Sequence, residues 1–270
     1  MASDLSRYAK HGHRRVEGWL LSGAIELVME LAAFQRERGV EGPACEIGVH
    51  HGRLFILLHL LALPERALGI DLFELQSENV DQSGEGSRDA LNRNLRTHGC
   101  DPSRVELLTE NSLRLTPERI IELCGGRPRL FSVDGGHTAE ITANDLALAD
   151  RSVCDGGLVI LDDYFNSSWP AVSEGACRFM SEGGRLHPVA IGANKFVFAK
   201  GDAAAAAYRE HVVACHPGAS RSTVFAQPVV CLGDGGPRTL RSRITTSPQW
   251  LRIRQTPVGR ALLRLKGKRT

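Results

Sequence analysis

Five short apolar runs, separated by stretches of helical length, are the feature that most limits how this chain can fold. The clearest run, residues 158–161 (Leu-Val-Ile-Leu), is apolar at four consecutive positions, which is typical of a strand covered by helices on both faces. We predict parallel strands over residues 43–49, 67–71, 105–109, 129–134 and 157–162. Two further runs, residues 189–191 and 195–199, flank a Gly-Ala-Asn turn and predict an antiparallel hairpin. The chain is therefore expected to be an α/β protein with a doubly wound, Rossmann-like, mostly parallel sheet that ends in an antiparallel C-terminal hairpin.

Helices are expected between these strands and before the first of them. Apolar residues such as Trp19, Leu27 and Leu31 recur at helical spacing and predict a helix over residues 15–39. Further helices are predicted over residues 54–63, 86–98, 116–124, 139–153 and 169–181. We divide the chain into an N-terminal helical cap (1–40), an α/β domain (41–200) and a C-terminal extension with a basic tail (201–270).

Positive charge is concentrated at one end of the chain. Residues 235–270 hold ten Lys or Arg and no acidic residue. Of the 33 basic and 31 acidic residues in the chain, the first 234 positions therefore hold 23 basic and 31 acidic residues, so this part is acidic. A short helix starting at Pro257 is predicted in this tail. Docking on the acidic body or on a partner subunit is the favoured interpretation, and contact with a membrane surface or a nucleic acid is the alternative.

Cysteine usage and hydropathy indicate the compartment. The seven cysteines are scattered without a Cys-x-x-Cys pair, which favours reduced, mostly buried thiols over a disulfide framework or a zinc site. The sequence has no run of 18 apolar residues, and its polar first 15 residues do not resemble a signal peptide. We therefore expect a cytoplasmic protein without stable membrane insertion.

A glycine-containing loop follows the first predicted strand. Its sequence, Glu46-Ile-Gly48-Val-His-His-Gly52, lets the backbone pass close to a ligand and opens a helix with free N–H groups. A carboxylate stands where a dinucleotide-binding loop has its first glycine, and it suits a cationic ammonium or sulfonium ligand better than a pyrophosphate. A tight strand–helix turn without a ligand is the alternative.

Polar residues also end the second and third strands. Asp71 follows Glu46 by 25 residues, one βαβ unit, and can accept both hydroxyls of a ribose. An ordinary capping aspartate is the alternative. Asn111 and Ser112 can read an adenine edge, although they are equally common loop residues.

Acidic residues and an imidazole end the fourth and fifth strands. Asp134 and His137 belong to an Asp-Gly-Gly-His segment, and Asp162 and Asp163 follow 28 residues later. Adjacent parallel strands lie roughly 4.8 Å apart, so these groups converge, and the carboxylates repel one another unless a cation neutralises them. Oxygen ligands favour a hard divalent ion such as Mg²⁺. The alternative is that Asp162 caps the next helix and Asp163 faces solvent.

Together these segments resemble the class I S-adenosylmethionine-dependent methyltransferases. Within that class they are similar to the metal-dependent branch of the macrolide-sugar and novobiocin-sugar O-methyltransferases and the cephalosporin-hydroxylase-like proteins. The resemblance covers roughly residues 40–200 and also includes Gly69-Ile-Asp71 and Gly192-Ala-Asn-Lys195. Its specific part is the Asp-Gly-x-His segment with the Asp162-Asp163 pair.

The resemblance implies a role for each matching residue. Mg²⁺ or another hard divalent cation would be held by Asp134, Asp162 and Asp163, and His137 would be the catalytic base. S-adenosylmethionine would be bound by Glu46, Gly48, Gly52, Asp71, Asn111, Ser112 and Asp134.

The resemblance implies methylation of a hydroxyl on a small molecule, and we expect that molecule to be a sugar of a glycosylated natural product. A different reaction on the same fold, like that of the cephalosporin-hydroxylase-like relatives, and a non-catalytic adenosyl-ligand-binding protein are the alternatives. We expect a homo-oligomer that does not bind nucleic acid. The polar segment 76–88 is a candidate substrate lid or an inert surface loop.

Overall fold

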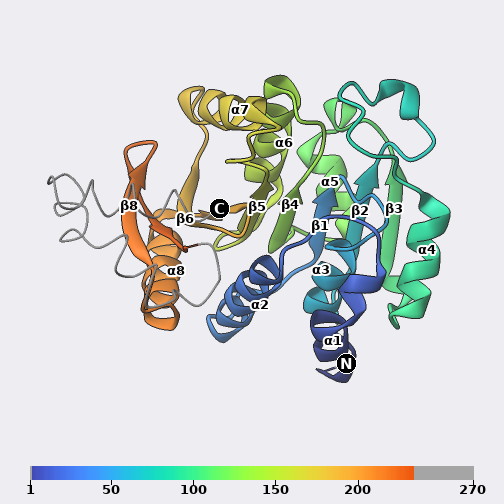
Figure 1. Cartoon of the computed structure of the whole chain (residues 1–270), viewed down its shortest axis with the longest axis horizontal. Coiled ribbons are helices and arrows are strands. Elements are labelled where there is room, and N and C mark those ends of the chain that lie inside the picture. The colour runs from blue at the N-terminus through green and yellow to red at the C-terminus, as the bar shows by residue number, and fades with distance from the viewer. Residues whose placement is uncertain (1, 234–270) are drawn as a thin grey trace, which may run out of the picture. The chain divides into compact units, whose positions relative to one another are not determined.

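The computed structural model describes residues 2–233, which form a nine-stranded sheet with the order β3-β2-β1-β4-β5-β7-β6-β9-β8 (Figure 1). The strands are β1 (Ala44–Ile47), β2 (Ala67–Asp71), β3 (Val105–Thr109), β4 (Leu130–Val133), β5 (Leu158–Asp162), β6 (Leu186–Gly192), β7 (Lys195–Lys200), β8 (Ser220–Val224) and β9 (Gln227–Cys231). Strands β1 to β5 are parallel to one another. Strand β7 runs antiparallel to both β5 and β6. The predicted doubly wound sheet with an antiparallel hairpin is therefore confirmed.

Helices cover both faces of this sheet. They are α1 (Ala2–Lys10), α2 (Ser22–Glu37), α3 (Phe55–Ala62), α4 (Arg88–Thr97), α5 (Pro117–Cys124), α6 (Ala139–Ser152), α7 (Pro170–Ser181) and α8 (Asp202–Cys215), with short 3-10 turns at Gly12–Arg15, Gln76–Glu78, Pro102–Arg104 and Ser112–Arg114. Buried residues of α1, α2, α3, α4 and α8 form one apolar cluster, and those of α5, α6 and α7 form another. Neighbouring strand residues alternate between the two, as Ala44 and Cys45 do, because successive side chains point to opposite faces of a sheet.

Local sequence explains where several helices begin and end. The side chains of Ser87, Thr116 and Thr138 accept hydrogen bonds from the first turns of α4, α5 and α6, as N-cap residues do. Helix α5 ends at Gly125 in the left-handed conformation (φ +74°), which glycine adopts without steric cost.

The helix predicted over residues 15–39 is wrong at its N-terminal end. Helix α2 begins only at Ser22, after a segment with an extended Leu21 and with Gly18 at φ +133°. Trp19 is 80 % exposed, so its helical spacing from Leu27 and Leu31 does not reflect a buried helix face. The prediction also missed α1, α8 and the β8–β9 hairpin. Strand β8 (Ser-Arg-Ser-Thr-Val) is largely exposed and therefore lacks the apolar pattern that identifies a strand.

The strand register aligns the carboxyl ends of four neighbouring strands, β2, β1, β4 and β5. Ile47 pairs with Ile70 and Val133, and Val133 pairs with Leu161. The residues that come next, Gly48, Asp71, Asp134 and Asp162, therefore lie at one level along the carboxyl edge of the sheet. In doubly wound folds this edge is where ligands bind.

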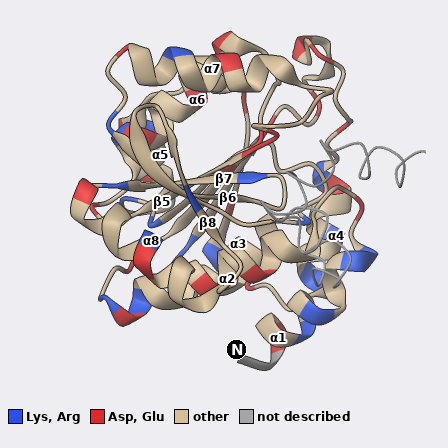
Figure 2. Cartoon of the chain, turned by 60° about the vertical axis from the view of Figure 1, so that its left-hand side comes forward, with Lys and Arg blue, Asp and Glu red and all other residues tan. Residues whose placement is uncertain are grey.

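The outer helices carry both signs of charge, and Lys and Arg are most prominent on α4 (Figure 2). None of the helices in residues 2–233 combines the length and hydropathy needed to cross a membrane. The predicted tail helix and the rest of the basic tail lie outside the described residues.

Candidate active site

A cavity of about 1010 Å³ opens at the carboxyl edge of the sheet. It is lined by nine of the predicted site residues: Glu46, Gly48, Asp71, Asn111, Ser112, Asp134, His137, Asp162 and Asp163. Of the predicted set, Gly52 is not among the described residues that line it. A Cβ on Gly52 would lie 2.3 Å from Leu91 Cδ1, and its φ is +89°, so this glycine allows α4 to pack under the loop.

The loop after β1 brings a buried carboxylate to the cavity. Glu46 is 2 % exposed, and its Oε2 has no hydrogen-bond partner among the described residues. Burial and the nearby negative charge of Asp134 raise the pKa of Glu46 well above its usual value. A cationic ligand in the cavity would relieve both costs, because it restores the pairing that a buried carboxylate needs.

Gly48 lets strands β1 and β4 approach closely at this point. A Cβ on Gly48 would lie 1.7 Å from the carbonyl oxygen of Asp134, and its φ is +84°. Only glycine fits such an approach. At Gly48 the backbone of the loop therefore lies beside Asp134 with no side chain between them.

Asp71 organises the backbone at the end of β2. Its Oδ2 accepts a hydrogen bond from the backbone N–H of His50 at 2.7 Å, and its Oδ1 accepts one from that of Phe73 at 2.9 Å. Each carboxylate oxygen accepts more than one hydrogen bond, so the group retains capacity for the hydroxyls of a ligand. Asp71 thus stabilises the loops that contain His50 and Phe73 and also lines the cavity.

Asn111 and Ser112 are partly committed to the fold. The Asn111 side chain accepts from the Leu113 N–H at 3.0 Å and donates to Glu78 Oε2 at 2.8 Å. The carbonyl of Ser112 accepts from Asn144 at 3.3 Å. Both residues line the cavity, and the Asn111 side chain is also hydrogen-bonded to Glu78 and to the Leu113 backbone.

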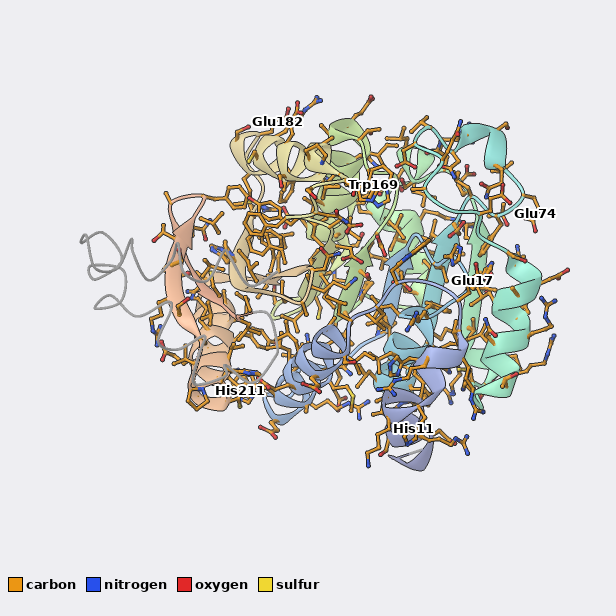
Figure 3. All side chains as sticks on the ribbon, in the orientation of Figure 1. His11, Glu17, Glu74, Trp169, Glu182 and His211 are labelled. Atoms are coloured by element: carbon orange, nitrogen blue, oxygen red, sulfur yellow. The ribbon has the colours of Figure 1, made fainter. Side chains whose placement is uncertain are left out.

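His137 lies between two carboxylates. Its Nδ1 is 2.9 Å from Asp81 Oδ2 and its Nε2 is 3.2 Å from Asp163 Oδ2. Burial alone would lower the pKa of His137, but the hydrogen bonds with Asp163 and Asp81 outweigh burial and raise it. The indole of Trp169, labelled in Figure 3, stacks on the imidazole at 4.3 Å between ring centroids and 18° between ring planes. Two hydrogen bonds and a stacked ring therefore fix the orientation of this histidine.

Asp134 and Asp163 face the same imidazole. One ligand atom each from Asp134, His137 and Asp163 lies within 4.8 Å of the others, a grouping that can hold a metal ion. Burial, followed by the charge of Asp162, raises the pKa of Asp134 well above its usual value. Asp163 behaves differently, because hydrogen bonds with His137, Asn166 and Asn194 outweigh the effect of burial and lower its pKa to about 2.

Asp162, which the resemblance assigns to the metal ion, is paired with other residues of the protein. It forms a buried ion pair with Lys195, its partner in the register of β5 and β7. Its Oδ1 also accepts from the Asp163 N–H and from Asn194 Nδ2, each at 2.9 Å. Asp162 therefore stabilises the turn that carries Asp163. The third member of the possible metal-binding group, beside Asp134 and Asp163, is His137.

Sequence reasoning missed Asp81, Trp169 and Lys195 as partners of these groups. Asp81 lies on the polar segment between β2 and α4, and Trp169 immediately precedes α7. Neither is attached to a strand end or a recognisable motif, so only their contacts reveal them. Lys195 begins β7 opposite Asp162. The available signals were its position at the start of the second strand of the predicted hairpin and its place in the Gly192-Ala-Asn-Lys195 segment.

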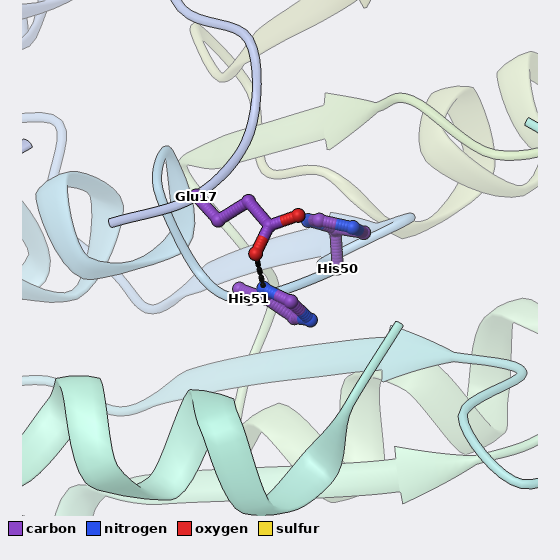
Figure 4. A group of neighbouring side chains, drawn as sticks. All are labelled: Glu17, His50 and His51. Carbon is purple, nitrogen blue, oxygen red and sulfur yellow. Dashed lines mark ion pairs between the residues drawn. The ribbon is translucent and has the colours of Figure 1, made fainter. Parts of the chain in front are cut away.

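Glu17, His50 and His51 form a second polar group beside the cavity (Figure 4). The Glu17 carboxylate points toward both imidazoles, and its Oε2 lies 3.3 Å from His51 Nδ1. The two imidazoles stack on each other at 4.0 Å. His50 lines the cavity, so this group forms part of the cavity wall.

Residues 45–164 match a family described as a methyltransferase domain. None of the curated proteins matches the chain. Among solved structures, the O-methyltransferase NovP is similar with a TM-score of 0.54 and 18% identity, covering 66% of this chain and 80% of its own. CalS11, a TDP-rhamnose 3′-O-methyltransferase of calicheamicin biosynthesis, has a TM-score of 0.51 and 20% identity, covering 68% and 82%. An O-methyltransferase from Bacillus cereus in complex with SAH has a TM-score of 0.50 and 17% identity, covering 73% and 90%. At these identities the likeness to the solved structures establishes the fold.

Proposed function

We propose that this chain, which carries a methyltransferase domain on the class I S-adenosylmethionine-dependent methyltransferase fold, methylates a hydroxyl oxygen of a small molecule. The observation that carries the proposal is the placement of His137. It lies in the cavity between Asp81 and Asp163, with Asp134 beside it. This arrangement suits removal of a proton from an acceptor hydroxyl.

The residues around the β1 loop fit a cationic adenosyl cofactor. S-adenosylmethionine, when bound, supplies an activated methyl group on a positively charged sulfur. Glu46 Oε2, which has no hydrogen-bond partner within residues 2–233, is suited to the ammonium group, and Asp71 is suited to the ribose hydroxyls. We propose that the backbone at Gly48, which carries no side chain, lies in close contact with the cofactor. Asn111 and Ser112, which line the cavity, would contact its adenine.

The acidic grouping fits a hard divalent cation such as Mg²⁺. When bound, such an ion lowers the pKa of a nearby hydroxyl and stabilises the oxyanion. We assign its binding to Asp134 and Asp163, with His137 close by. Asp162 supports this site through its hydrogen bond with the Asp163 N–H, and its own carboxylate neutralises Lys195.

His137 acts as the general base in this proposal. A carboxylate beside Nδ1 favours the tautomer that carries its proton on that nitrogen, which leaves the lone pair on Nε2. Asp81 lies 2.9 Å from Nδ1 and Asp163 lies 3.2 Å from Nε2. Since the proposal gives the Asp163 carboxylate to the cation, Nε2 would be the nitrogen free to take the acceptor proton. The methyl group for the new O–CH₃ bond would come from S-adenosylmethionine, which would depart as the adenosyl thioether.

We propose a sugar-containing acceptor and a lid formed by residues 76–88. At about 1010 Å³ the cavity is at the upper end of the size range of ligand pockets, which leaves room for an acceptor beside a cofactor. Segment 76–88 contributes Gln76, Asn79, Ser83 and other residues to its wall, and Asp81 ties it to His137. CalS11, which shares the fold, acts on TDP-rhamnose, and this supports the choice of sugar.

The test is transfer of labelled methyl from S-adenosylmethionine to a panel of nucleotide-linked sugars and glycosylated small molecules. Mass spectrometry of the product should locate the label on a hydroxyl oxygen. His137→Ala should reduce turnover by about 10²- to 10⁴-fold while leaving affinity for S-adenosylmethionine nearly unchanged, and His11→Ala, at an exposed position, serves as control. Tighter binding of NAD than of S-adenosylmethionine, or wild-type turnover in His137→Ala, would contradict the proposal.

A further inference from the structure

A separate cluster of metal-ligand side chains lies between helices α2 and α8. Glu30 comes from α2, and His211 and Cys215 come from α8. One ligand atom from each lies within 4.8 Å of the others. None of the three lines the cavity described above, and Figure 3 places His211 and Trp169 in different parts of the fold.

The distances in this cluster match the edges of a metal coordination shell. His211 Nε2 is 3.6 Å from Glu30 Oε1, and Cys215 Sγ is 3.7 Å from His211 Nε2. Tetrahedral bonds of the usual zinc lengths place such N···O and N···S pairs about 3.3 and 3.6 Å apart. These two pairs are therefore within a few tenths of an ångström of the separations in a zinc site, and the third pair, Glu30 with Cys215, lies within 4.8 Å.

Glu30 presents a buried carboxylate oxygen beside His211 and Cys215. Its Oε1 is buried and has no hydrogen-bond partner among the described residues, and the 3.6 Å to His211 is too long for a hydrogen bond. A buried polar atom without a partner is costly. An ion bound to this oxygen would remove that cost.

The neighbours of the cluster hold its members in place. His211 and Cys215 are four residues apart, so they share one face of α8. The Phe34 ring stacks on the His211 imidazole at 4.0 Å and 14°. His216 Nε2 lies 2.9 Å from Glu30 Oε2 and thereby orients the carboxylate, as residues behind metal ligands commonly do.

We propose that Glu30, His211 and Cys215 bind a transition-metal ion of the Zn²⁺ type and so join α2 to α8. A thiolate, an imidazole and a carboxylate together favour Zn²⁺ over Mg²⁺. Cys215 is exposed at the surface, so the fourth position is open to water. Binding releases the thiol proton of Cys215 to solvent. The scattered cysteines did not indicate a zinc site, because Glu30 and His211 are distant in sequence and meet only in the fold.

Cobalt titration of the full chain tests this site, because a thiolate ligand gives Co²⁺ a charge-transfer absorption band. The acidic grouping around His137 and the Glu17 group contain no cysteine, so they cannot produce that band. Wild-type protein should show a band that saturates at one Co²⁺ per chain and is displaced by Zn²⁺. Cys177→Ser, which removes another exposed free cysteine, should leave the band unchanged.

Variants of the cluster complete the test. Cys215→Ser should abolish the band, His211→Gln should weaken Co²⁺ binding at least tenfold, and His216→Gln should weaken it by about 10- to 100-fold. Their metal-free melting temperatures should match that of the wild type, which checks that they fold, and Zn²⁺ should raise the melting temperature more for the wild type than for Cys215→Ser. Absence of the band in the wild type, or its persistence in Cys215→Ser, would overturn the proposal.

Discussion

Asp81, 56 residues upstream of His137, contacts both the backbone N–H and the imidazole Nδ1 of that histidine through one carboxylate oxygen. The contact joins the segment between β2 and α4 to the residue that we assign as base. It makes the orientation of His137 depend on the position of this segment. A carboxylate that fixes the tautomer of a catalytic histidine contributes to turnover without touching the substrate.

Asp81→Asn tests this dependence. We expect turnover to fall by about 10- to 100-fold with little change in affinity for S-adenosylmethionine, because the amide no longer favours a proton on Nδ1. Glu85→Gln makes the same change of charge at an exposed position of the same segment and should keep wild-type turnover. Steady-state kinetics on the three proteins would decide the matter, and equal turnover in all of them would remove Asp81 from the mechanism.

Metal removal tests the acidic grouping of Asp134, His137 and Asp163. Activity should disappear in EDTA and return with Mg²⁺, because the oxyanion then regains its counter-charge. Asp163→Asn should raise the Mg²⁺ concentration needed for half-maximal activity, since one ligand carries less charge. Full activity of metal-free protein would be incompatible with a metal-assisted reaction.

Asp71→Asn tests the cofactor end of the cavity. The amide keeps the size of the side chain but loses one acceptor, so binding of S-adenosylmethionine should weaken by about 1.5–3 kcal/mol. Calorimetry gives the affinity directly. A melting temperature measured on the same sample separates this loss from damage to the hydrogen bonds with His50 and Phe73. Unchanged affinity would exclude Asp71 from the cofactor site.

The buried pair of Asp162 and Lys195 predicts a stability effect. Burial alone would lower the pKa of Lys195, but Asp162 and Asp134 outweigh burial and raise it, so the ammonium stays charged. Asp162→Asn should cost about 3–5 kcal/mol of unfolding free energy, because it removes the closest partner of a buried charge. In a double-mutant cycle with Lys195→Met, measured by urea denaturation, the double variant should lose less than the sum of the single losses. Glu122→Gln, in an exposed pair with Arg119, should have little effect, and additive losses would show that Asp162 and Lys195 are not coupled.

His59 predicts how folding stability depends on acid pH. This residue is fully buried in α3, neither ring nitrogen has a hydrogen-bond partner among the described residues, and burial lowers its pKa to about 4. The unfolded chain, with a histidine pKa of about 6.5, then binds the proton at higher pH than the folded chain. Stability from this group is therefore complete above about pH 6.5 and is lost as the pH falls toward 4, with a loss of about 2 kcal/mol at pH 5.

Urea denaturation at pH 7 and pH 5 measures this loss. His59→Leu should remove about 2 kcal/mol of the difference between the two pH values, whereas His11→Gln, at an exposed position, should not. If His59→Leu showed the same pH dependence as the wild type, another group would be responsible.

The amino-acid sequence was enough to predict the parallel sheet and the residues at its carboxyl edge. The strands were visible because burial on both faces demands an apolar run such as residues 158–161, and the acidic residues stood where those runs stop. The register then placed Asp71, Asp134 and Asp162 at one level, as their positions after the runs implied. Predictions of this kind depend on local periodicity, which a single sequence contains.

Which of these groups contact one another could be learned only from the three-dimensional fold. Asp162 pairs with Lys195 because β7 runs antiparallel beside β5, and His137 meets Asp81 because a polar segment without periodicity folds over the cavity. Glu30 meets His211 because α2 and α8 pack on the same face of the sheet. Such contacts depend on the path of the chain in space. No local pattern in the sequence records them, because the residues involved are far apart along the chain.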